Sequence, residues 1–61
     1  MNLTNLDFTN TDLSFANLTG AKLRHARLFM ANLKYSNLTL ADLGHADLNL
    51  ANLHYAILVW K

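Results

Sequence analysis

The chain has 61 residues, carries a net charge of +1 and contains no cysteine. At this length we expect a single domain, residues 1–61, without disulfide support, and the small net charge excludes general electrostatic capture of nucleic acid. No apolar run approaches the roughly 18 residues of a transmembrane helix, and the N-terminus lacks the basic segment of a signal peptide. We therefore expect no membrane span and a cytoplasmic location.

A large apolar residue recurs at every fifth position along the whole chain. The series is Leu3, Phe8, Leu13, Leu18, Leu23, Leu28, Leu33, Leu38, Leu43, Leu48, Leu53 and Leu58. On an α-helix, five residues advance a side chain by roughly 140°, so this series forms no apolar stripe. On a straight strand, an odd spacing turns every second member outward. Burying all twelve together requires a corner in every repeat, which predicts a coil of very short β segments with leucine pointing inward.

The other positions of the repeat have characters of their own. The residue two before each leucine is mostly alanine, as at Ala16, Ala21 and Ala26, which suggests a second, inward-facing column of small side chains. The residue directly before leucine is mostly Asn or Asp, whose side chains bind nearby backbone N–H groups in turns and can stack into ladders. The fifth position varies freely.

Written as a unit, the repeat is A-(D/N)-L-x-x, as in Ala16-Asn17-Leu18-Thr19-Gly20 and Ala51-Asn52-Leu53-His54-Tyr55. In this pattern the chain resembles the pentapeptide-repeat family, and the resemblance covers essentially its whole length. The resemblance implies an all-β fold, a right-handed quadrilateral β-helix with four repeats per coil and about three coils. Each residue would then stack on the residue 20 positions later.

The variable position supports this 20-residue register. With it, Phe15, Tyr35 and Tyr55 fall on one face, whereas a triangular coil of 15 residues would stack Phe15 with Met30 and His45. The charges do not distinguish the two registers. We therefore infer the square coil from the aromatic residues and from the family resemblance.

Candidate chemical sites are sparse. His25 and His45 should be stacked neighbours, but a metal site needs a third or fourth ligand, and that column offers only Asn5. The four carboxylates all occupy the turn position where Asn serves equally well, which indicates a backbone-binding role. No nucleophile motif or phosphate-binding glycine loop is present. We expect no catalytic, metal or cofactor site and no enzymatic activity.

The middle of the chain is basic. Lys22, Arg24, Arg27 and Lys34 all lie there. A nucleic-acid interface would use such residues together with nearby aromatic rings. The coil places them on three faces, with aspartate layers above and below, so we expect pairing between layers and no direct nucleic-acid binding.

Two sets of residues are candidates for protein contacts. Phe15, Tyr35 and Tyr55 would form a stack of rings on the surface, which either stabilises adjacent layers or docks a partner. Ile57 and Val59 replace polar residues of the repeat, and Trp60 follows them. This C-terminal set would either seal the open core, dock against a second copy, or continue into a longer protein. We favour docking, because members of the family are commonly dimers joined at their C-terminal coils.

The sequence therefore predicts a non-catalytic structural or protein-interaction module. We expect a homodimer formed through the C-terminal coil, an unidentified protein partner, or both. The resemblance also implies an alternative, a DNA mimic that inhibits or protects a type II topoisomerase. That activity depends on a long, acidic rod, whereas this chain is short and carries a net charge of +1. A subunit buried within a larger complex is a third possibility.

Overall fold

The first eleven repeats, residues 1–55, share one backbone pattern in the computed structural model, which describes residues 1–59. The second residue of each of these repeats forms an isolated β-bridge, and the fourth and fifth residues form a turn. No continuous strand or helix occurs in residues 1–59, and none of their segments is a helix long and apolar enough to cross a bilayer.

The turn closes each repeat with a backbone hydrogen bond from the first residue of the next repeat to the central leucine. In the middle of the chain, Ala26 N–H donates to the Leu23 carbonyl at 3.0 Å. The fifth residue, the third of this turn, has a positive φ, for example 60° at His25, as a type II turn requires. The corner predicted from the period of five is thus a β-turn.

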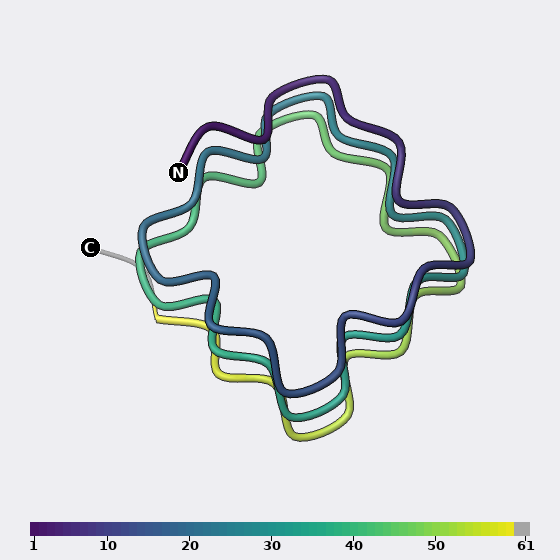
Figure 1. Cartoon of the computed structure of the whole chain (residues 1–61), viewed down its shortest axis with the longest axis vertical. Coiled ribbons are helices and arrows are strands. Elements are labelled where there is room, and N and C mark those ends of the chain that lie inside the picture. Colours follow the sequence, from purple (N-terminus) through teal and green to yellow (C-terminus); the bar gives the residue numbers. More distant parts are fainter. Residues whose placement is uncertain (60–61) are drawn as a thin grey trace.

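Parallel β-bridges set the register between successive passes of the chain. They join residues 20 positions apart: Asn2 to Lys22, Asp7 to Arg27, Asp12 to Asn32, Asn17 to Asn37, Lys22 to Asp42, Arg27 to Asp47, Asn32 to Asn52 and Asn37 to Ile57. One full turn of the coil therefore takes four repeats. Figure 1 shows the resulting four-cornered outline, with each pass of the trace lying over the previous one. No bridge in the described residues has the 15-residue spacing of a triangular coil.

Hydrogen bonds between layers have a fixed polarity. We call residues 1–20 the first layer, 21–40 the middle layer and 41–59 the last layer. In each repeat of the first and middle layers, the leucine and the fifth residue donate their N–H groups to the following layer, as Leu23 does to Asp42 O and His25 to Gly44 O. The second residue donates to the preceding layer, as Asp42 does to Ala21 O at 2.9 Å. Each repeat thus has two donors facing the next layer and one facing the previous layer.

The core consists of the leucine and alanine columns of the middle layer. Leu23, Leu28 and Leu33 are fully buried, and each stabilises the fold by about 1.5–3 kcal/mol. Burial is incomplete toward both ends: Phe8 and Leu48 are half-buried, and Leu58 is 44% exposed. The expectation that all twelve large residues are buried together was therefore wrong for the end layers, because within residues 1–59 each of these has a neighbouring layer on one side only.

Candidate functional site

The Asn and Asp side chains at the second position bind the backbone of their own repeat. Each carboxyl or amide oxygen accepts the N–H of the residue two positions later, for example Asn32 from Lys34 at 3.0 Å and Asp12 from Ser14 at 2.9 Å. This is the role expected from the sequence. The bridges place Asn17 over Asn37 and Asn32 over Asn52, but no hydrogen bond joins two of these side chains in residues 1–59.

The same contacts favour the charged form of Asp7 and Asp12. The Thr9 hydroxyl donates to Asp7 at 2.5 Å, and this bond, together with the Thr9 N–H, lowers the pKa of Asp7. The Ser14 hydroxyl and N–H lower the pKa of Asp12 in the same way. A carboxylate used as a backbone acceptor with a lowered pKa is a poor general acid or base.

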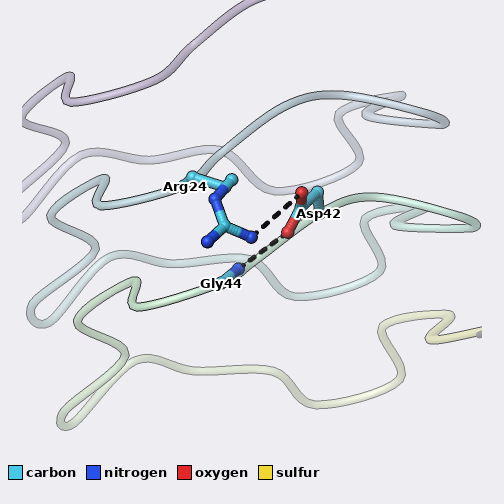
Figure 2. Close-up of polar contacts among 3 residues, drawn as sticks. All are labelled: Arg24, Asp42 and Gly44. Carbon is cyan, nitrogen blue, oxygen red and sulfur yellow. Dashed lines mark hydrogen bonds and ion pairs between the residues drawn. The ribbon is translucent and has the colours of Figure 1, made fainter.

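One ion pair crosses from the middle to the last layer. Arg24 Nη1 lies 3.5 Å from Asp42 Oδ2, and Asp42 also accepts the Gly44 N–H at 3.0 Å (Figure 2). The Gly44 N–H, and after it the charge of Arg24, lower the pKa of Asp42. The sequence analysis expected pairing between layers for the basic residues of the middle of the chain, but it did not single out this pair, whose signal is the glycine 20 positions after Arg24.

His25 and His45 stack as expected, with ring centroids 5.0 Å apart and an interplanar angle of 5°. Parallel rings direct their nitrogen lone pairs in parallel, whereas ligands of one metal ion must converge on it. No group of three His, Cys, Asp or Glu side chains in the described part of the chain is placed to hold a metal ion.

The aromatic ladder, Phe15, Tyr35 and Tyr55, is an exposed stack of rings on the surface. The centroids of Phe15 and Tyr35, and of Tyr35 and Tyr55, lie 5.1 Å apart with nearly parallel rings. The three side chains are 75%, 45% and 65% exposed, respectively. Lys34 Nζ lies 5.6 Å from the Tyr35 ring, and His54 contacts Tyr55 edge-on. The ladder therefore presents ring edges, bordered by cationic or polar groups, to solvent.

Backbone strain is concentrated at the corners that carry these side chains. Tyr35, Leu40 and Leu50 have φ values of 62°, 58° and 59°, in a region that costs an L-residue other than Gly or Asn about 1–2 kcal/mol. Gly20 and Asn10 occupy equivalent corners without that cost. The fold does not require large apolar residues at the corners, so their presence needs another explanation, such as stacking or binding.

The C-terminal set of candidate contact residues lies only partly within the described residues. Ile57 and Val59 are 49% and 47% exposed on the last layer, and Trp60 lies outside the described residues. The structure adds Leu58, an inward-facing leucine that is 44% exposed because no layer follows it in residues 1–59. The sequence analysis missed Leu58 because it matches the repeat. Phe15 lies two layers away, at a corner of the first layer.

Comparisons with known proteins agree with this geometry. A family model described as pentapeptide repeats, in eight copies, matches residues 1–29 and 26–60. The chain belongs to the pentapeptide repeat family. The solved pentapeptide repeat proteins that it resembles are right-handed β-helices, which is the fold class expected from the sequence. Among curated proteins, none matches this chain.

Two solved pentapeptide repeat structures show how closely the coil is shared. The crystal structure of Rfr23, from the cyanobacterium Cyanothece 51142, is 38% identical, with a TM-score of 0.91 over 98% of this chain. A pentapeptide repeat protein of the Arabidopsis thaliana thylakoid lumen is 32% identical, with a TM-score of 0.64 over 95% of this chain. The chain spans 44% and 47% of the lengths of these two pentapeptide repeat proteins, respectively.

Proposed function

We propose that this chain is a non-catalytic structural and protein-interaction module that self-associates through its last layer. In this proposal its twelve repeats form three coils of four. The observation that carries it is the exposure of Ile57, Leu58 and Val59, each between 44% and 49%, at the end of the coil. Three consecutive exposed aliphatic residues are typical of a surface that is covered in an assembly.

The aromatic ladder supports a second, lateral contact. Rings that are mostly exposed, and held on strained corners, are suited to bind the apolar surface of another protein. Lys34 beside Tyr35 and His54 beside Tyr55 would form the polar rim of such a contact. The partner at this lateral surface is a protein of unknown identity.

The topoisomerase alternative gains no support from the charges. A DNA mimic needs a continuous acidic surface, whereas the backbone register places Arg27 between Asp7 and Asp47, and Arg24 pairs with Asp42. The net charge of +1 also differs in sign from that of DNA. We therefore favour assembly and protein binding over DNA mimicry.

Solution mass tests the proposed self-association. The variant Ile57→Asn with Val59→Thr restores residues that the repeat uses at these positions, so its fold should be intact. We expect light scattering to give a mass above that of the monomer for the unmodified chain and a lower mass for the variant. Met30→Asn, which removes an equally exposed apolar residue from a corner, should leave the mass unchanged. A monomeric unmodified chain would refute self-association.

A further inference from the structure

The last layer ends in a row of backbone donors that have no partner within residues 1–59. In the first and middle layers, the N–H groups of the leucine and of the fifth residue bind the following layer. In the last layer, the corresponding N–H groups make no hydrogen bond within residues 1–59: Leu43, His45, Leu48, Leu50, Leu53, Tyr55 and Leu58. The carbonyls of the first position accept none either: Ala41, Ala46, Ala51 and Ala56.

The first layer ends in the opposite set. Its second-position N–H groups bind nothing within residues 1–59: Asn2, Asp7, Asp12 and Asn17. The carbonyls of the second and fourth positions are open as well, apart from the Thr9 carbonyl, which accepts only a long contact of 3.5 Å from the Thr11 hydroxyl. Per repeat, the last layer offers two donors and one acceptor, and the first layer offers two acceptors and one donor.

We propose that the occupant of the last layer is the first layer of a second copy of this chain, stacked head to tail. This proposal rests on the self-association proposed above and specifies its geometry. Both surfaces are built on the same 20-residue turn, so each donor of one copy meets an acceptor of the other with the spacing found between layers within the chain. Strand addition at an open edge gains its affinity from such main-chain hydrogen bonds.

A tail-to-tail pair of two last layers is less well matched. Each facing repeat would then bring two donors and one acceptor, so one N–H per repeat would find no ladder carbonyl. Leaving a buried donor unsatisfied is costly, and the last layer would repeat that cost at each side of the square. The donor and acceptor pattern therefore favours the head-to-tail arrangement.

Apolar surfaces at the two ends also fit this arrangement. Leu58 at the last layer is 44% exposed, and Met1 and Leu6 at the first layer are 66% and 45% exposed. Stacking would bring these ends together and continue the leucine column from one copy into the next. Because the two contact surfaces differ, each dimer retains one free end of each kind, and the assembly grows as an open rod.

The second copy can be rotated about the coil axis so that the 20-residue turn continues unbroken from one copy into the next. This rotational register has one favourable and one unfavourable contact. It places Tyr55 of one copy next to Phe15 of the following copy, which continues the aromatic ladder. It also places Asp47 next to Asp7, and two like charges at neighbouring positions repel each other. In this register Asp7→Asn should strengthen association, while the Asn side chain keeps the turn contact to Thr9 that Asp7 makes.

Two matched variants distinguish the geometries. Leu6→Lys places a charge on the first layer, Leu58→Lys places one on the last layer, and both sites are about equally exposed. Leu40→Lys, at a corner of the middle layer, serves as the control, and circular dichroism confirms folding of each. Sedimentation equilibrium then gives the mass of each variant alone and of an equimolar mixture of the two end variants.

In the head-to-tail geometry, the unmodified chain and Leu40→Lys grow beyond a dimer as concentration rises. Each end variant alone is a monomer, and their mixture forms a dimer that does not grow. If Leu6→Lys alone still forms a dimer, the contact is tail to tail, which overturns this inference and leaves the proposed self-association intact. If the unmodified chain is a monomer, both fail. Should an end variant not fold, Asp7→Asn provides the second test. If its association is unchanged or weaker than that of the unmodified chain, the stated register and the head-to-tail stacking are both overturned.

Discussion

Arg24 lies over Gly44 of the following layer, and it reaches Asp42 only because Gly44 has no side chain. A Cβ at Gly44 would lie 2.6 Å from Arg24 Nη1 and 3.2 Å from Asp42 Oδ1. The glycine therefore leaves room for the cation above it, and its own backbone does not need a glycine, since its φ is not positive. At Gly20 the situation is reversed, with a φ of 69° and no atom within 4 Å of a Cβ.

The two glycines should respond differently to alanine. Gly44→Ala displaces a flexible guanidinium from an exposed ion pair and restricts the unfolded chain, so we expect a change in unfolding free energy within about 0.5 kcal/mol. Gly20→Ala forces a Cβ into the left-handed region and should destabilise the fold by about 1 kcal/mol. Urea denaturation of both variants at one protein concentration checks this. A larger loss for Gly44→Ala would show that the Arg24 contact is rigid.

Ser36 is the polar exception in the column of small buried residues. Its side chain is fully buried, and its hydroxyl has no hydrogen-bond partner among the described residues. Removing an unsatisfied buried hydroxyl relieves its desolvation cost, so Ser36→Ala should stabilise the fold by about 1 kcal/mol. Ala26→Ser, which buries a new hydroxyl at an equivalent position, should destabilise it by a similar amount in the same thermal unfolding assay. A loss of stability in Ser36→Ala would mean that the hydroxyl has a partner in solution.

The corner residues allow stacking and backbone strain to be separated. Leu50 is 74% exposed with a φ of 59°, so Leu50→Asn should stabilise the fold by about 0.5–1 kcal/mol through relief of strain alone. Tyr35→Asn gains the same relief but loses two ring stacks, each of about 0.5–1.5 kcal/mol, and should be neutral or destabilising. Equal stabilisation by both substitutions, measured by chemical denaturation, would show that the ladder does not support the fold.

Acid should weaken the fold through its turn carboxylates. The pKa values of Asp7, Asp12 and Asp42 are lowered in the folded chain, so their contribution is fully present above the unfolded value of about 4 and is lost as pH falls through the lower folded values. The melting temperature should therefore be flat from about pH 7 to 5 and fall below about pH 4. Asp12→Asn keeps an oxygen for the Ser14 N–H and should reduce this fall. An unchanged pH profile in Asp12→Asn would contradict the role given to this carboxylate.

The five-residue spacing was sufficient to predict the coil, because only a backbone that turns a corner in every repeat can point all of these side chains inward. The 20-residue register followed from Phe15, Tyr35 and Tyr55 together with the family resemblance, and the bridges and ring stacks confirm it. The Arg24 to Asp42 pair could not be predicted in this way, because a long flexible side chain can reach several neighbours and the repeat does not choose among them. The exposure of Leu58 was also hidden, because burial depends on whether another layer follows it.

This dependence of burial on layer gives a direct prediction for the core. Leu28 is fully buried between two layers, so Leu28→Ala should cost about 2–5 kcal/mol through lost transfer energy and the cavity left behind. Leu58 has a layer on one side only within residues 1–59. At low protein concentration, Leu58→Ala should therefore lower the free energy of unfolding by less than about 1.5 kcal/mol. At high concentration the cost of Leu58→Ala should rise, because association buries this side chain and stabilises the unmodified chain by mass action. Thermal unfolding across a hundredfold range of concentration checks both statements, and a concentration-independent difference would place Leu58 outside any contact between copies.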